Sequence, residues 1–217
     1  MPTRTLSRRD FLKITGITLG ASVVTCSGLA ALATHRPAVN LSESTYGDQN
    51  MSKKILVAYA SKCGSTGEVA SAIGKTLAQA GARVDVMPLS KVTNLSDYQA
   101  VFVGSAIRMA KWLPEAANFV SENLAILQRV PTAYFTVCAT MIEDTPAKRA
   151  RAAGFIEPLR TVLTPAAEGY FAGKVDPNSL SFLENISLKA KDVPQGDFRD
   201  WDKITSWAQT TYAQICA

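Results

Sequence analysis

The residues best suited to chemistry lie close together in the run 59–73, which reads YASKCGSTGEVASAI. Ser61, Ser65 and Thr66 contribute three hydroxyl groups, and Gly64 lets the backbone approach an anion closely. A helical pattern follows, and the free amides and dipole at a helix N-terminus favour negative charge. The run therefore predicts a site for a monoester phosphate. It has neither the GxxxxGK(S/T) arrangement of a nucleoside-triphosphate loop nor the GxGxxG turn of a dinucleotide site.

Cysteine and histidine supply few further reactive groups. Without the first 33 residues, Cys63, Cys138 and Cys216 remain, an odd number that does not indicate a disulfide framework. Cys63 and Cys138 are a candidate redox pair, but their strands are predicted to be about 10 Å apart. Because a bridge needs alpha carbons within about 7 Å, two separate thiols are favoured. The single histidine, His35, is interpreted as a linker residue, and no cluster of ligands suggests a metal site.

Strand-like and helix-like segments alternate along residues 53–217, which we interpret as one domain. The continuous apolar run Ile55–Tyr59 is typical of a strand buried on both faces. The alternation predicts an α/β fold: a doubly wound five-stranded parallel sheet, order 2-1-3-4-5, with its ligand at the carboxyl ends of strands 1 and 3. The strands are predicted at 55–59, 84–87, 100–104, 132–137 and 168–175, and the helices at 66–80, 113–127, 146–163 and 201–215.

The N-terminal residues 1–33 predict export. The motif SRRDFLK at 7–13, followed by a mildly apolar stretch, resembles a twin-arginine leader, which a translocase for folded proteins reads. Cleavage is expected after Ala33 and places the protein in the periplasm or another extracytoplasmic space. An uncleaved anchor is an alternative, because about 20 residues can span a bilayer. In that case the leader is the expected membrane contact. A lipid-modified Cys26 is a weaker alternative.

The remaining bulk properties narrow the function classes. Residues 34–52 are polar and aperiodic, which predicts a linker, and Met51 is a candidate second start. Removing 33 residues leaves 184, enough for one domain with a sizeable core. The net charge of +5 lies mostly in the leader, so the rest carries about +2 without a basic cluster. We therefore expect no nucleic-acid partner.

The spacing Ser61-x-x-Gly64-x-Thr66, with Ala70, Ile73 and Tyr59 at the matching steps, resembles the FMN-phosphate signature of the flavodoxin family. Ala58 and Cys63 depart from that signature, and Cys63 removes one hydroxyl. The resemblance extends over the whole domain. Four further segments, 104–112, 134–141, 169–176 and 196–208, are similar to the branch of flavodoxin-like proteins that includes menaquinone-dependent protoporphyrinogen dehydrogenase. The first and last of these are the most specific.

The resemblance implies FMN as cofactor and assigns its contacts. Arg108 is then expected near the pyrimidine edge of the ring, with a surface arginine as the alternative. Trp112 either covers a ring face or packs the next helix, and packing is favoured. Trp201 and Trp207 are predicted to be core anchors. The phosphate is expected at Ser61, Lys62, Cys63, Gly64, Ser65 and Thr66, and the ring at Ala106, Ile107, Arg108, Met109, Cys138, Ala139 and Thr140.

The function implied is that of an exported FMN protein that transfers electrons between redox partners, without a bond-making site of its own. The alternative is a quinone-linked flavin dehydrogenase, so the partner is either a redox protein or a quinone, besides the twin-arginine translocase. A third class, a binding module that has lost its flavin, is disfavoured by the intact hydroxyls of Ser61, Ser65 and Thr66.

Overall fold

The structure, a computed structural model, describes residues 39, 41–181, 186, 190 and 193–216. The chain divides into two compact units, residues 38–176 with 194–217 and residues 1–37 with 177–193. The expected leader, residues 1–33, lies outside the described residues. In the smaller unit the structure describes a short 3-10 helix, η3 (Pro177–Ser179), and a few neighbouring residues. No helix within the described ranges is long and apolar enough to cross a membrane.

The larger unit is built on one mainly parallel sheet. Its strands are β1 (Ser44–Tyr46), β2 (Lys54–Ala60), β3 (Arg83–Pro88), β4 (Ala100–Arg108), β6 (Thr132–Val137) and β7 (Ala167–Phe171), in the order β1-β3-β2-β4-β6-β7. A short strand, β5 (Lys111–Trp112), pairs antiparallel with β4. The five strands β3-β2-β4-β6-β7 are parallel and confirm the predicted order 2-1-3-4-5. The sheet has the winding reversal between β2 and β4 that the sequence predicts.

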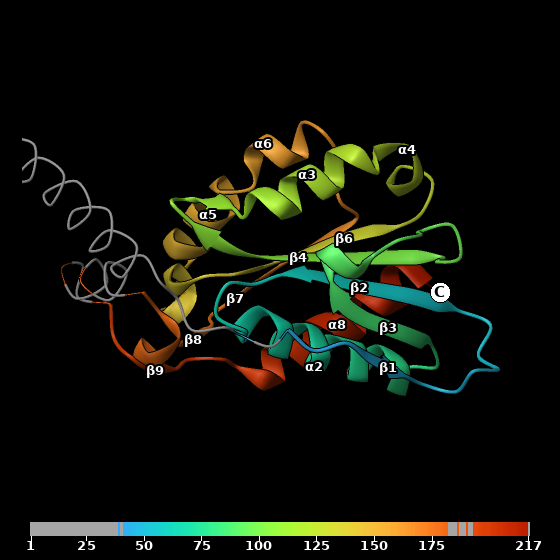
Figure 1. Cartoon of the computed structure of the whole chain (residues 1–217), viewed down its shortest axis with the longest axis horizontal. Coiled ribbons are helices and arrows are strands. Elements are labelled where there is room, and N and C mark those ends of the chain that lie inside the picture. The colour runs from blue at the N-terminus through green and yellow to red at the C-terminus, as the bar shows by residue number, and fades with distance from the viewer. Residues whose placement is uncertain (1–38, 40, 182–185, 187–189, 191–192, 217) are drawn as a thin grey trace, which may run out of the picture. The chain divides into compact units, whose positions relative to one another are not determined.

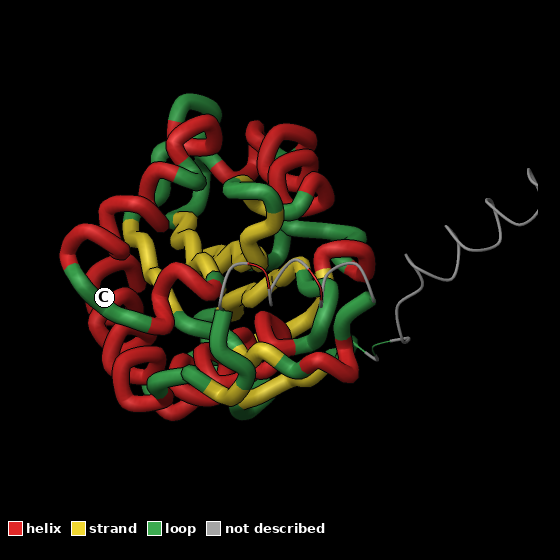
Figure 2. Tube along the Cα trace, turned by 90° about the vertical axis from the view of Figure 1, so that its left-hand side faces the viewer, coloured by secondary structure: helices red, strands yellow, loops and turns green. Residues whose placement is uncertain are grey.

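Helices cover both faces of this sheet (Figures 1 and 2). One face carries α2 (Ser65–Gln79) and α8 (Trp201–Cys216), and the other carries α3 (Pro114–Glu122), α4 (Leu124–Leu127), α5 (Pro146–Gly154) and α6 (Glu157–Arg160). Side chains of β2 alternate between the two hydrophobic clusters, with Leu56 and Ala58 in one and Ile55 and Val57 in the other. Both faces are thus buried, which explains the continuous apolar run in the sequence.

Two predicted helices are each divided in the structure. The segment 113–127 forms α3 and α4, which meet at Asn123, whose side chain donates to the Phe119 carbonyl at 2.9 Å. The segment 146–163 forms α5 and α6, and Pro158 lies in the first turn of α6, where a missing amide proton is tolerated. Neither division changes which face of the sheet the segment covers.

The edge strand β1 lies inside the segment 34–52 that we interpreted as a linker. It pairs antiparallel with β3, with Ser44 opposite Val86 and Tyr46 opposite Val84. The Thr45 hydroxyl donates to Asp85 at 2.9 Å. These three residues are therefore part of the sheet and not a tether, which corrects the interpretation for this part of the segment. A three-residue polar strand is too short to show periodicity, so the sequence pattern did not reveal it.

The predicted strand 168–175 is two strands in the structure. β7 ends at Phe171. β8 (Lys174–Val175) pairs antiparallel with β9 (Gly196–Asp197) in a separate two-stranded sheet, which is called the β8–β9 hairpin below. The chain leaves the main sheet between them, at Ala172 and Gly173. The apolar pattern runs on through this break, so the pattern alone does not show it.

The two tryptophans of α8 have different environments. Trp207 packs edge-on against Phe102 and Phe171, with ring centroids 5.9 and 5.4 Å away, and its indole donates to the Glu168 carbonyl at 3.0 Å. Trp201 is 41 % exposed, so its prediction as a core anchor was wrong. Residues six apart on a helix differ by about 120° around its axis, because each residue turns about 100°. The two side chains therefore face different sides.

Candidate functional site

The loop 61–66, called the phosphate loop below, connects the carboxyl end of β2 to α2. Gly64 is the N-cap of α2 and has a φ of 84°, in the left-handed region that glycine adopts at least cost. Its carbonyl accepts from the amides of Gly67 and Glu68 at 2.8 and 3.2 Å and so starts the helix. The Ser61 hydroxyl accepts from the Gly64 amide at 2.9 Å and closes the turn.

The three hydroxyl-bearing side chains of the phosphate loop are buried. Ser61 and Ser65 are each 8 % exposed, and Thr66 is 1 % exposed. The Ser65 hydroxyl accepts from the Lys174 amide at 2.9 Å. A hydroxyl that accepts one hydrogen bond keeps its own proton to donate. Ser61 and Ser65 are therefore fixed by the backbone and can still donate to an anion at the N-terminus of α2.

Lys62 and Cys63 are more exposed than the three hydroxyl-bearing residues of the phosphate loop. The Lys62 ammonium lies 2.7 Å from a Glu115 carboxylate oxygen, which joins the loop to the first turn of α3. Burial acts to raise the pKa of Glu115, but the hydrogen bond and charge of Lys62 hold it below its usual value. Cys63 is half-buried, and the structure has Cys63 and Cys138 as separate thiols, as favoured from the sequence.

The second predicted segment, 106–109, forms part of a tight hairpin between β4 and β5, called the ring hairpin below (106–112). Arg108 pairs with Lys111, so Met109 and Ala110 form a two-residue turn. Their φ values are 51° and 58°. Two positive φ values match a type I′ turn, which normally uses asparagine or glycine. Holding non-glycine residues there costs about 1 kcal/mol each, so this backbone is strained.

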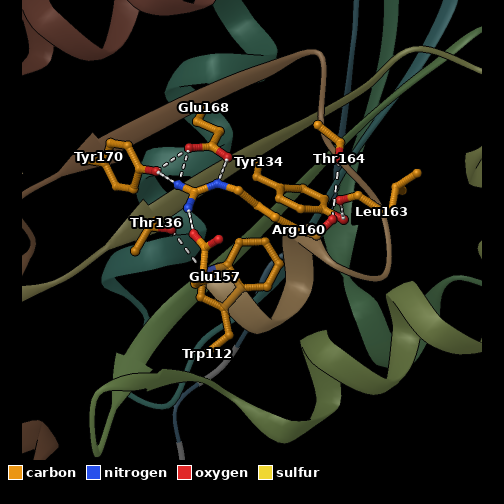
Figure 3. A network of polar contacts seen from close by, with 9 residues as sticks. All are labelled: Trp112, Tyr134, Thr136, Glu157, Arg160, Leu163, Thr164, Glu168 and Tyr170. Atoms are coloured by element: carbon orange, nitrogen blue, oxygen red, sulfur yellow. Dashed lines mark hydrogen bonds and ion pairs between the residues drawn. The ribbon is translucent and has the colours of Figure 1, made fainter. Parts of the chain in front are cut away.

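The tip of the ring hairpin faces solvent, whereas its base is anchored. Met109 is 89 % exposed, and Arg108 is exposed beside it. Trp112 is buried, and its indole donates to the Thr136 hydroxyl at 2.9 Å (Figure 3). Its ring centroid lies 5.0 Å from that of Tyr134. Trp112 thus packs under the hairpin, which confirms the favoured interpretation.

The third predicted segment follows β6. Cys138 is buried, and its amide donates to the Phe171 carbonyl at 3.0 Å, while a 3-10 helix, η2 (Ala139–Ile142), begins at the next residue. Burial raises the pKa of the Cys138 thiol, so it stays protonated at neutral pH. Ala139 is exposed and Thr140 is half-buried. Within this segment the thiol is therefore buried, and the small side chain of Ala139 is exposed.

The three segments lie at one edge of the sheet. They lie at the carboxyl ends of β2, β4 and β6, which are parallel neighbours, with Ala60 opposite Ser105 and Ala106 opposite Val137. Carboxyl ends of adjacent parallel strands meet at the same edge. The structure thus brings all the predicted site residues to this edge: Ser61, Lys62, Cys63, Gly64, Ser65, Thr66, Ala106, Ile107, Arg108, Met109, Cys138, Ala139 and Thr140.

A cavity of about 400 Å³ adjoins the phosphate loop on the side of β3 and α3. Of the predicted site residues it includes Ser61, and sequence reasoning missed the rest of its lining. Four of its residues come from one face of α3, at the three- and four-residue spacing of a helical face: Glu115, Asn118, Phe119 and Glu122. The lining includes Leu41, Leu89, Ser90, Glu115, Phe119 and Glu122.

A polar network joins α6 to β7 (Figure 3). Two nitrogens of Arg160 lie 2.6 and 2.7 Å from the two carboxylate oxygens of Glu168, and Arg160 also donates to Tyr170 at 2.9 Å. Arg160 and Tyr170 hold the pKa of Glu168 below its usual value, although burial alone would raise it. The network pins α6 to β7 and is interpreted as structural. The described part of the chain contains no cluster of three or more metal-binding side chains.

Comparison with known proteins identifies the fold family. Residues 56–200 match the family described as Flavodoxin domain. The chain is 24% identical over 168 residues to protoporphyrinogen IX dehydrogenase (quinone) of Leishmania major, covering 73% of this chain and 72% of that protein. It is 26% identical over 98 residues to the same enzyme of Escherichia coli K12, covering 44% of this chain and 53% of that protein. It therefore spans about half the length of the Escherichia coli relative.

The chain is also similar, at low sequence identity, to solved structures of flavodoxins. An archaeal flavodoxin is 18% identical with a TM-score of 0.46, covering 76% of this chain and 99% of that chain. Oxidised flavodoxin 1 of Bacillus cereus is 14% identical with a TM-score of 0.49, covering 75% of this chain and 99% of that chain. The family assignment is drawn from the domain match, and the strand order from the sheet itself.

Proposed function

From the premise that this chain belongs to the flavodoxin domain family and binds FMN, we propose that it carries electrons between redox partners. The observation that carries the proposal is the phosphate loop. It holds buried hydroxyls and a left-handed glycine at a helix N-terminus, at the point where the winding of the sheet reverses. Bound FMN would supply one- and two-electron chemistry.

The residues present fit FMN at both ends. Ser61, Ser65 and Thr66 are buried donors beside the N-terminus of α2, which suits the phosphate. The ring hairpin and the segment after β6 lie at the same edge and suit the ring. Arg108 would place a cation near it, where positive charge stabilises a reduced flavin. These residues bind and orient the cofactor.

The exposed tip of the ring hairpin favours electron transfer over a reaction in an enclosed pocket. With Met109 at 89 % exposure, a partner can approach this end of the site directly. Electron transfer needs such approach and no residue that forms or breaks a bond. We therefore rank a redox partner protein first among the acceptors and donors.

A quinone-linked dehydrogenase is the second candidate. It is supported by the similarity to protoporphyrinogen IX dehydrogenase (quinone) over 168 residues. The cavity of about 400 Å³ beside Ser61 offers space for a small aromatic molecule. Measuring oxidation of the reduced protein by a menaquinone analogue, with and without porphyrinogen, separates the two candidates. Catalytic consumption of porphyrinogen would reverse the ranking.

Export belongs to the same proposal. The motif at 7–13 supports recognition by a twin-arginine translocase and delivery to the periplasm or an equivalent space. The test replaces Arg8 and Arg9 by lysine and follows the protein in cell fractions, with N-terminal mass analysis of the native protein. If the wild type and the lysine variant were distributed equally between the cell fractions, export by this route would be contradicted. A native N-terminus at Met51 would show that the leader is not used.

The decisive experiment on the cofactor is a titration of purified, folded protein. We expect a flavin absorbance spectrum as isolated, or stoichiometric uptake of added FMN with quenching of its fluorescence. Riboflavin, which lacks the phosphate, should bind far more weakly. Folded protein that takes up neither molecule would contradict the proposed function.

A further inference from the structure

We propose that Arg199 is a positioning residue for the phosphate of FMN, acting by neutralising Glu68 and by fastening the β8–β9 hairpin against the phosphate loop. The inference rests on the proposed function. It assigns a role to the segment 196–208, whose resemblance to known relatives is specific but which lies outside the predicted set of cofactor contacts.

The β8–β9 hairpin touches the phosphate loop directly. The Lys174 amide donates to the Ser65 hydroxyl at 2.9 Å, a contact between residues 109 positions apart. Gly173 makes this approach feasible, because a Cβ there would lie 3.0 Å from the Ser65 hydroxyl oxygen and 2.9 Å from a Val137 methyl carbon. The position of the hairpin therefore determines how Ser65 is held.

Arg199 fastens the hairpin to α2. Its side chain is 6% exposed, and its guanidinium lies 2.6 Å from the Glu68 carboxylate. It also binds Asp197 on β9 with two nitrogens, at 2.7 and 2.5 Å. The guanidinium carbon lies 4.6 Å from the centre of the Trp201 ring. Arg199 thus joins the first turn of α2, the β8–β9 hairpin and the start of α8.

The charge of Arg199 matters because of where Glu68 lies. Glu68 is in the first turn of α2, and its amide bonds to the carbonyl of Gly64, the N-cap. A carboxylate there suits an empty helix N-terminus, but it repels a phosphate, which carries about −1.5 to −2 charge at pH 7. Asp197 adds a second negative charge through the hairpin. Arg199 lies against both carboxylates and offsets their repulsion.

The test compares FMN with riboflavin, because the two differ by the phosphate. Dissociation constants are measured by fluorescence quenching on the full chain for the wild type, Arg199→Ala, Glu68→Gln and the double variant. We expect Arg199→Ala to weaken FMN binding about tenfold and riboflavin binding less than about twofold. Glu68→Gln alone should leave FMN binding as tight or tighter. Adding Glu68→Gln to Arg199→Ala should recover at least half of the loss.

Further variants separate the charge of Arg199 from the general effects of losing an arginine. Arg160→Ala is the matched control, because it removes an arginine that binds a carboxylate with two nitrogens away from the phosphate loop. It should leave the FMN-to-riboflavin ratio unchanged. Arg199→Lys keeps the charge and should preserve most of the ratio. Arg199→Gln removes the charge but keeps a long polar side chain, and it replaces Arg199→Ala as the test if that variant does not fold.

Two results would overturn the inference while leaving the proposed function intact. One is equal weakening of FMN and riboflavin in Arg199→Ala. The other is an unchanged ratio in a folded Arg199→Ala or Arg199→Gln protein that binds FMN tightly. Failure of the wild-type protein to bind FMN would overturn both proposals together.

Discussion

At the phosphate end of the site, the hydroxyl-bearing side chains are buried and two of them already accept hydrogen bonds from backbone amides. At the ring end, the hairpin tip is exposed and holds Met109 and Ala110 at positive φ. The first region is held by contacts within the protein, since its turn, its helix and the β8–β9 hairpin are hydrogen-bonded to one another. The second carries strain and faces solvent. The difference suggests a division in which the phosphate end sets affinity and the ring end sets redox behaviour and partner access.

The largest effect is expected from removing donors at the phosphate end. Ser61→Ala combined with Thr66→Ala removes two hydroxyls, and a hydrogen bond to a charged group contributes about 1.5–3 kcal/mol. FMN affinity should fall by about 100-fold or more, while riboflavin affinity changes little. Thr76→Ala is the control, because it removes a buried hydroxyl farther along α2. An unchanged FMN affinity would mean that the phosphate binds elsewhere, and it would contradict the division between the two ends of the site.

Gly64→Ala tests whether the shape of the phosphate loop matters as much as its donors. Alanine at a φ of 84° costs about 1–2 kcal/mol, and its Cβ would lie 3.1 Å from a Val39 methyl carbon. We expect a lower free energy of unfolding and about tenfold weaker FMN binding.

Gly81→Ala is the matched control for this substitution. Gly81 has a φ of 101° with open space around its Cβ position, at the far end of α2. It should lose stability without losing FMN affinity. A parallel loss of affinity in both variants would show that global stability, and not the loop, controls binding.

The same contrast explains how much the sequence could reveal. Local sequence patterns predict the strands β2, β4 and β6 and the phosphate loop. Buried parallel strands give short continuous apolar runs, and the Ser-x-x-Gly-x-Thr turn is a motif of neighbouring residues. The strand predicted at 100–104 continues to Arg108 in the structure, where it turns back into β5. Neither this extension nor the strain of the turn was predicted, because Met109 and Ala110 are ordinary residues at unusual φ values.

Contacts between distant residues account for what the sequence did not reveal. The strand β1 depends on pairing with β3, and the hydrogen bond from Lys174 to Ser65 spans 109 positions. The Arg199–Glu68 ion pair likewise joins residues that no local pattern connects. Such contacts are set by the folded arrangement of elements, so a single sequence gives no signal for them.

The ring end is tested by removing its strain. Met109→Gly combined with Ala110→Gly places glycine at both positive-φ positions, where it carries no steric penalty. The free energy of unfolding of the flavin-free protein should rise by about 1 kcal/mol in a denaturant titration. The FMN-to-riboflavin ratio should stay constant, since the phosphate end is untouched. A fall in that ratio would contradict the division between the two ends.

A smaller effect is expected from Arg108→Ala. Loss of a cation near the ring should make reduction of the bound flavin harder and lower its midpoint potential by about 30 mV, which corresponds to about 0.7 kcal/mol for one electron. FMN affinity should change less than about twofold. Lys111→Ala removes a neighbouring exposed charge on the same hairpin. It measures how far the midpoint potential shifts when any nearby surface charge is lost. Equal shifts in the two variants would mean that Arg108 acts only as a surface charge.

The smallest effect concerns the Lys62–Glu115 ion pair, which connects the phosphate loop to the helix after the ring hairpin. Both side chains are more than a third exposed, so screening limits the contribution of the pair to stability to less than about 0.5 kcal/mol. Because the pKa of Glu115 lies below its usual 4.5 in the folded protein, this contribution is present above pH 4.5 and is lost as the pH falls through the lowered value. Lys62→Ala should therefore differ slightly from the wild type in unfolding free energy at pH 7, and this difference should shrink as the pH falls below 4.5, with Glu115→Gln showing the same dependence. A change in midpoint potential in Lys62→Ala would reveal coupling between the two ends, because this contact links the loop that holds the phosphate to the segment that supports the ring hairpin.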